Sequence, residues 1–177
     1  MQTFSLLGFV AHLHAVDRDM KELGPAIVAR ACEMVAAEAK RVIGTYDYGW
    51  PELKPETLAR KFYDTPLLET GEMRDSIEWQ AHGLTGEVGS NSDKALWQEL
   101  GTSRIPPRSF LAGAAQHMGP EIEKMAAKAV RAVVLGKGLH SSEMGELLHL
   151  LRHVGHAVKE AADYALETDE ERSRRRR

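Results

Sequence analysis

The sequence predicts an α+β fold: a long N-terminal helix, a small antiparallel β-hairpin and two further helices towards the C-terminus. Two observations support this prediction. Long stretches repeat apolar residues every three to four positions, and one short stretch alternates apolar with polar residues. The chain is 43% hydrophobic but only 6% aromatic, so aliphatic and alanine side chains must supply most of its core.

The first 43 residues carry the helical period, and Gly44 is expected to end this helix. Gly24-Pro25 interrupts it, and proline both removes a backbone donor and clashes with the preceding turn. We therefore expect a kink there or two abutting helices, and the continuous apolar phase favours one bent unit. Cys32 lies in an alanine-rich run, which favours a small buried side chain over a reactive thiol.

The period is lost between residues 45 and 71, where glycine, proline and aromatic residues indicate a long loop with a short helix over Pro55–Phe62. A loop of this length is usually functional or an assembly arm. The alternative is that Tyr48 and Trp50 cover one end of the core.

Residues 77–88 are expected to form a hairpin, because apolar residues alternate with polar ones on both sides of a turn at Gly83. A lone hairpin is marginal in water. It must therefore pack on a helix or be extended by strands of a neighbouring subunit.

Two helices follow the hairpin. The first is expected over Asp93 to Leu100 with Asp93 as its cap, and Gly101 ends it. Pro106 or Pro107 suits the first turn of the second helix, which should end near residue 136.

We divide the chain into an α+β domain at residues 1–136, a helical extension at 137–167 and a charged, disordered tail at 168–177. The extension carries an apolar heptad pattern three repeats long. It suits packing on the domain's own helices as well as coiling between subunits.

His149, His153 and His156 have the helical spacing of metal ligands. No nearby glutamate completes a His-Glu-x-x-His pattern, so a solvated histidine-rich face is the simpler interpretation. A small metal-dependent enzyme or metal sensor is the alternative from another functional class.

The sequence offers little for catalysis. It has no Gly-x-Ser-x-Gly elbow, phosphate loop or Rossmann glycine pattern. The carboxylates Glu69, Glu72, Asp75 and Glu78 are interpreted as the exposed face of a loop and short helix. We expect neither enzymatic activity nor a cofactor.

A net charge of -3 gives no global attraction to nucleic acid, but the last six residues hold five arginines. These arginines suit nonspecific DNA contact, attachment to an acidic partner, or a solvated terminus: Arg172, Arg174, Arg175, Arg176 and Arg177. No stretch approaches the roughly 18 apolar residues of a membrane span, so we expect a soluble protein made in the cytosol that does not bind membranes.

The region from Trp50 to Ala115 carries an ordered set of short motifs. They are Trp50-Pro51-x-Leu53, Thr70-Gly71-x-Met73-Arg74-x-Ser76-Ile77, Gly86-x-Val88-Gly89, Trp97-x-Glu99-x-Gly101-Thr102 and Pro106-Pro107-Arg108-Ser109-Phe110-Leu111. In this order they resemble the head–tail joining and tail-completion proteins of tailed bacteriophages, the virion morphogenesis type. Ser109 departs from the family pattern, which often has a second proline there, and the chain beyond residue 136 lies outside the resemblance.

The resemblance implies a structural subunit in the neck or tail end of a virion. Such a subunit assembles, expected as a homo-oligomeric ring, with neighbouring neck and tail proteins, and has no cofactor or catalytic residue. A portal-side adaptor or a minor tail protein of the same region fits nearly as well. A host helical interaction module is a further alternative.

The residues singled out for assembly lie in the same region: Trp50, Arg74, Glu99, Gly101, Thr102, Arg104, Pro106, Pro107 and Arg108. Glycine and proline fix an irregular backbone between two helices there. Arg104 and Arg108 bracket that loop and could contact a carboxylate on the next subunit. The alternative is a purely intramolecular connection.

Overall fold

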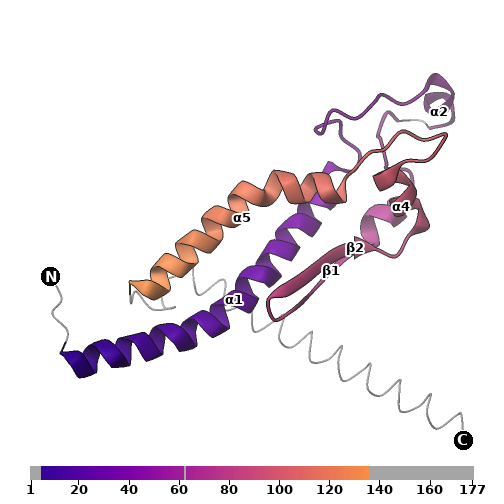
Figure 1. The fold of residues 1–177 in the computed structure, drawn as a ribbon. Coiled ribbons are helices and arrows are strands. Elements are labelled where there is room, and N and C mark those ends of the chain that lie inside the picture. The colour runs from indigo at the N-terminus through magenta and orange to yellow at the C-terminus, as the bar shows by residue number, and fades with distance from the viewer. Residues whose placement is uncertain (1–4, 62, 136–177) are drawn as a thin grey trace, which may run out of the picture. The chain divides into compact units, whose positions relative to one another are not determined.

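The computed structural model describes residues 5–61 and 63–135 and confirms the α+β prediction (Figure 1). Its elements are α1 (Leu6–Val42), α2 (Pro55–Arg60), α3 (Glu72–Asp75), β1 (Ile77–His82), β2 (Thr85–Ser90), α4 (Asp93–Leu100) and α5 (Leu111–Val134). The chain divides into two compact units. One is Leu23–Lys128, and the other joins Met1–Glu22 with Ala129–Arg177. The predicted helical extension and charged tail lie outside the described residues.

Helix α1 is a single helix that continues through Gly24 and contains Pro25. The alternative of two abutting helices is therefore wrong. From Leu23 onward its buried apolar positions recur at helical spacing, and most of them are small: Leu23, Ala26, Ala29, Cys32, Ala36, Ala39 and Val42. Alanines on one face let other backbone segments approach α1 closely.

The β-hairpin is one of the segments that pack closely against α1. Strands β1 and β2 pair antiparallel, with Trp79 opposite Val88, and the turn contains Gly83 at φ 59°. A Cβ added at Gly86 would collide with the sulfur of Cys32, so the backbone of β2 lies directly against α1. The hairpin thus packs on a helix of its own chain, as one of the two predicted alternatives requires.

Cys32 behaves as the sequence predicts. Only 8% of the residue is exposed, and burial raises the pKa of its thiol. A raised pKa keeps the thiol protonated and unreactive at neutral pH.

The core of the Leu23–Lys128 unit lies where the end of α1, the start of β1 and the start of α5 meet. Phe110 is fully buried there, with Val42 and Ile77 beside it. Trp50 belongs to the same core and meets the Tyr48 ring edge to face, with ring centroids 5.6 Å apart. The interpretation that Tyr48 and Trp50 cover one end of the core is confirmed.

The predicted range of α4 is confirmed, but its predicted cap residue and the predicted start of α5 are wrong. Asp93 is the first helical residue of α4, and Ser92 occupies the cap position. Pro106 and Pro107 do not lie in the first turn of α5, which begins at Leu111. The reason is a side-chain cap from α4, described below, that fixes the start of α5 after the prolines.

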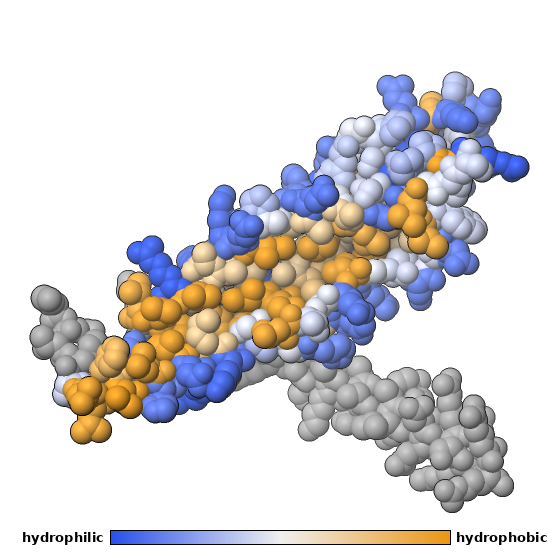
Figure 2. All heavy atoms as spheres, viewed as in Figure 1, coloured by the Kyte–Doolittle hydropathy of each residue, from blue (hydrophilic) through white to orange (hydrophobic). Residues whose placement is uncertain are grey.

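In the second unit, the N-terminal part of α1 leaves large apolar side chains exposed, including Leu6 at 82% and Leu7 at 85% (Figure 2). Ala129 and Val133, at the end of α5, are buried. None of the helices in the described part of the chain combines the length and apolar character needed to cross a membrane.

Candidate functional site

The loop between α4 and α5 has a fixed irregular backbone, as its glycine and prolines predict. Gly101 ends α4 at φ 75°, and a Cβ there would lie 2.9 Å from the Pro107 nitrogen. The Thr102 amide donates to the Ile105 carbonyl at 2.9 Å, while the Thr102 hydroxyl accepts hydrogen bonds from the amides of Arg104 and Ile105. The loop is thus held by its own hydrogen bonds.

Glu99, at the end of α4, caps the start of α5. One carboxylate oxygen accepts from the Ser109 hydroxyl at 2.6 Å and the Ala112 amide at 3.0 Å. The other accepts from the amides of Phe110 at 2.8 Å and Leu111 at 2.9 Å. These amides are among the donors that a helix start leaves unpaired, and the helix dipole favours a negative charge there. Glu99 therefore acts within the chain, as the intramolecular alternative expects.

Arg108 ties this loop to a segment more than fifty residues earlier. Its amide donates to the Gln98 carbonyl at 2.7 Å. Its guanidinium donates through Nη2 to the carbonyls of Pro51 at 2.9 Å and Glu52 at 3.5 Å. Only 6% of the residue is exposed, and its buried Nε has no hydrogen-bond partner among the described residues.

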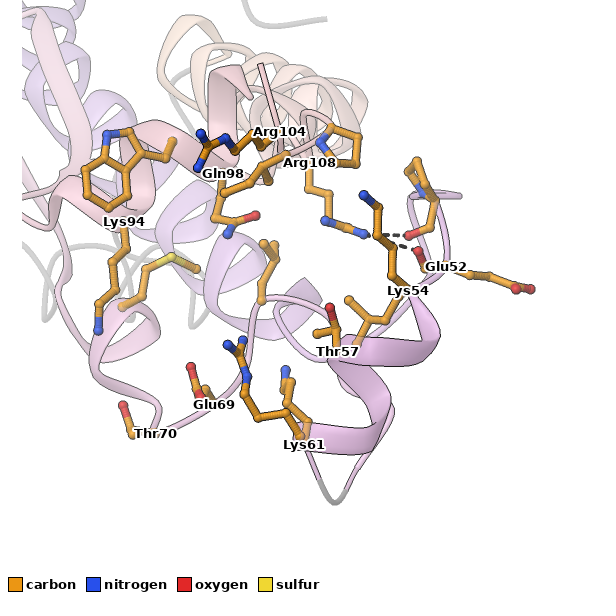
Figure 3. A pocket seen from close by; sticks show the side chains of 18 of the residues that line it. Glu52, Lys54, Thr57, Lys61, Glu69, Thr70, Lys94, Gln98, Arg104 and Arg108 are labelled. Atoms are coloured by element: carbon orange, nitrogen blue, oxygen red, sulfur yellow. Dashed lines mark hydrogen bonds between the residues drawn. The ribbon is translucent and has the colours of Figure 1, made fainter. Parts of the chain in front are cut away.

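These contacts form one wall of a pocket of about 440 Å³ within the Leu23–Lys128 unit (Figure 3). Its lining comes from residues 51–61, residues 67–73, α4 and residues 104–108. Six lining side chains are basic: Lys54, Arg60, Lys61, Lys94, Arg104 and Arg108. Two are acidic, Glu52 and Glu69, which leaves the lining with a formal charge of +4.

Lys61 is a pocket residue whose pKa is shifted by its surroundings. Its Nζ donates to the Thr65 carbonyl at 2.6 Å. Burial lowers its pKa, Glu69 and Asp64 oppose that effect, and the like charges of Arg108 and Arg60 add to it. Burial is thus the main cause that disfavours the charged form of Lys61.

The structure brings most of the predicted assembly residues together in or beside this loop, from Glu99 to Arg108, and two lie elsewhere. Trp50 is 9% exposed and belongs to the core. Arg74 lies on α3, where its Nε donates to Asp75 at 2.9 Å.

Sequence reasoning missed the other pocket residues, which include Lys94, Trp97 and Gln98 on α4. The one available signal was the cluster of Lys54, Arg60 and Lys61 in the long loop.

A second polar cluster was also missed. Glu38 is 8% exposed and accepts two hydrogen bonds from Arg41, at 2.7 and 2.8 Å, and one from the Tyr48 hydroxyl at 3.0 Å. Its pKa is lowered, chiefly by the hydrogen bond from Arg41. Burial, followed by the bond to Glu38, raises the pKa of Tyr48 to about 12. The Arg41 guanidinium also donates to Asp47 at 2.7 Å, so the cluster joins α1 to the loop that follows it.

Residues 5–61 and 63–135 contain no group of three or more histidine, cysteine or acidic side chains placed to hold a metal ion. The predicted ligands His149, His153 and His156, and the five tail arginines, lie outside the described residues. Comparison with protein-family models, curated proteins and solved structures finds no match to this chain.

Proposed function

We propose that the chain is a non-enzymatic structural subunit of the neck or tail end of a tailed bacteriophage. In this proposal it assembles with copies of itself and with neighbouring virion proteins, completing the tail so that head and tail can join. The order of motifs from Trp50 to Ala115 suggests the family. The observation that carries the assembly role is the large apolar surface left exposed on α4.

Three large side chains of α4 are at least half exposed: Leu96 at 58%, Trp97 at 50% and Leu100 at 71%. Leu84, in the hairpin turn, is exposed at 74%. Burying one such side chain stabilises a complex by about 1.5–3 kcal/mol. Clustered exposed apolar residues mark interaction surfaces more often than scattered ones do, so α4 supports docking onto a partner.

The hairpin supports the same role. Among the described residues the sheet has two strands, so the outer edge of each lacks a strand partner. An open edge is a liability in an isolated subunit, yet it accepts a strand from a neighbour in an assembly.

The mechanism is conformational. Edges and apolar surfaces left unpaired in the free subunit pair with neighbours when it docks, and no covalent chemistry is involved. A portal-side adaptor or a minor tail protein would use the same surfaces, and the position of the chain within the particle separates these roles.

Particles made by the phage or prophage that encodes this sequence provide the direct test. Mass spectrometry of purified particles should detect the chain at a fixed copy number, and cryo-electron microscopy should locate it at the neck or tail end. Particles that form normally and lack the chain would refute the proposal.

Native mass spectrometry of untagged protein, over a concentration series with and without chelator, tests the same idea in isolation. A closed, metal-free oligomer supports a ring and gives its subunit count. Stoichiometric zinc on a stable monomer would instead favour the histidine site at His149, His153 and His156. For a metal-free monomer, incorporation into particles decides the question.

Two variants identify the surface. Leu100→Asp places a charge at a side chain that is 71% exposed, so the subunit should fold normally. We expect Leu100→Asp to reduce incorporation strongly. Arg104→Ala should also spare folding and weaken assembly, because Arg104 is exposed in the loop. Normal incorporation of Arg104→Ala would exclude the loop as an interface.

A further inference from the structure

The pocket in Figure 3 holds a buried cation without a counter-ion. The Arg108 guanidinium reaches two backbone carbonyls, and no carboxylate of the described residues lies within ion-pair distance of it. Buried charges in proteins are normally paired, because removing an unpaired charge from water is costly. The unpaired Nε of Arg108 and the unpaired Oε1 of Gln98 leave this wall with unmet hydrogen-bonding capacity.

The surrounding cations are also uncompensated. Lys54, Arg60 and Arg104 form no ion pair with any described residue, and Lys94 pairs only with Glu72, at 3.4 Å. In Figure 3 the labelled basic side chains lie around one shared opening and come from separate segments of the chain. A formal charge of +4 around one concave site contrasts with a net charge of -3 for the whole chain. The charge therefore belongs to the site and does not reflect a generally basic surface.

Apolar side chains share the lining with these cations: Leu53, Leu67, Met73, Trp97 and Ile105. Trp97 is half exposed, so its ring is available to a ligand. Sites for the nucleic-acid backbone align cations along a stripe that follows the phosphates. Here the cations are gathered in a pocket that also has apolar walls. This combination suits a carboxylate carried next to an apolar side chain, because arginine binds carboxylates through paired N–H donors.

We infer that this pocket binds an acidic peptide segment of a partner protein. Its carboxylates would lie among Arg60, Lys61 and Arg104 at the opening, near buried Arg108, and a neighbouring apolar side chain would contact Trp97. Recognition of acidic motifs by clustered basic residues is a recurrent mode of peptide binding. The inference deepens the assembly role proposed above, on which it rests for the nature of the partner, and it gives the docking segment a chemistry.

Protonation of Lys61 provides a second way to detect peptide binding. The pKa of Lys61 is lowered chiefly by burial, Glu69 and Asp64 oppose that effect, and the like charges of Arg108 and Arg60 add to it. A bound carboxylate would stabilise the charged form and raise the pKa. Peptide binding at a pH close to the lowered pKa of Lys61 should therefore be accompanied by proton uptake. Calorimetry in buffers of different ionisation enthalpy measures that uptake directly.

The test uses the full chain and a blocked hexapeptide of alternating leucine and glutamate, followed by tryptophan fluorescence and calorimetry. We expect binding tighter than about 1 mM, which weakens as salt is added. The neutral hexapeptide of leucine and glutamine should not bind. A Trp97→Phe variant should lose the fluorescence change, which would place the peptide beside that ring, and calorimetry measures its affinity separately.

Charge reversal separates the pocket from general electrostatics. The double variant Arg60→Glu with Arg104→Glu changes two exposed pocket residues and should weaken binding at least about tenfold. The matched control, Lys124→Glu with Arg131→Glu, makes the same change in net charge at exposed positions of α5 and should bind normally.

Three outcomes would overturn the inference: no binding of the glutamate peptide, equal binding by both double variants, or tighter binding of a short oligothymidylate through the same residues. The last result would make the pocket a phosphate site. Failure here leaves the particle test above intact, because incorporation can use the hairpin and the exposed Leu96 and Leu100 of α4, which do not line this pocket. Peptide binding by a chain absent from particles would refute only the proposed phage role.

Discussion

Replacing Glu99 by alanine tests the claim that one carboxylate on α4 fixes the start of α5. The substitution removes the acceptor of four hydrogen bonds, three from backbone amides and one from the Ser109 hydroxyl. Phe110 is fully buried, so its amide cannot readily exchange Glu99 for water. Leaving such a donor unpaired costs about 1–3 kcal/mol. Loss of a helix cap adds about 1 kcal/mol, and loss of the charge at the helix dipole about 0.3–1 kcal/mol.

We therefore expect Glu99→Ala to lower the free energy of unfolding by about 3 kcal/mol, against about 5–15 kcal/mol for a typical domain. Urea denaturation followed by circular dichroism measures this difference. The melting temperature should fall on the order of 10 °C. Glu99→Gln keeps one acceptor oxygen and loses the charge, so it should fall between the wild type and the alanine variant.

Glu123→Ala is the matched control, because Glu123 is an exposed glutamate within α5. It should change stability by less than about 0.5 kcal/mol. If Glu99→Ala costs less than 1 kcal/mol more than this control, the carboxylate is not what determines where α5 begins. The explanation given for the displaced helix start would then fail.

Three further predictions concern the loop, the core and the acidic cluster. Gly101→Ala should lower the free energy of unfolding by about 1–3 kcal/mol more than Gly49→Ala does. Both glycines have positive φ, but only at Gly101 would the added Cβ meet a backbone atom, the Pro107 nitrogen 2.9 Å away. Thermal denaturation compares the two variants, and equal losses of stability would contradict the steric argument. Phe110→Asp should abolish folding, since a charge would enter a fully buried position, and a native circular dichroism spectrum would contradict this. The pKa of Glu38 in the folded protein lies below its ordinary 4.5. The ionised carboxylate should therefore contribute stability that is complete above about pH 4.5 and lost as the pH falls through the lowered pKa. In urea titrations, the free energies of unfolding of the wild type and of Glu38→Gln should differ less in acid than at neutral pH.

The hairpin was predictable because its signal is local. Strict alternation around Gly83 needs no information from elsewhere in the chain, and the structure pairs Trp79 with Val88 as that alternation requires. The start of α5 was not predictable in the same way. Local rules favour proline in a first turn, but the cap comes from Glu99, eleven residues before Phe110.

The pocket could not be predicted from the sequence for a related reason. Its basic residues are spread from Lys54 to Arg108, and only the fold brings them to one opening. Periodicity also failed to say which part of α1 is buried among the described residues. Leu6 and Val42 fit the same helical pattern, yet Leu6 is 82% exposed and Val42 is fully buried.

The fit of Gly86 over the sulfur of Cys32 has a practical consequence. The chain has one cysteine, and the backbone of β2 covers it with no intervening side chain. Packing of β2 on the sulfur should slow thiol reagents, and their reaction should speed up when the hairpin lifts away from α1. The alkylation rate under native conditions would report how often that happens. A neighbouring subunit that holds the hairpin against α1 should slow alkylation of Cys32. A neighbour that pulls a strand away from α1 should speed it up. Alkylation of this one cysteine can therefore be used to follow docking over time.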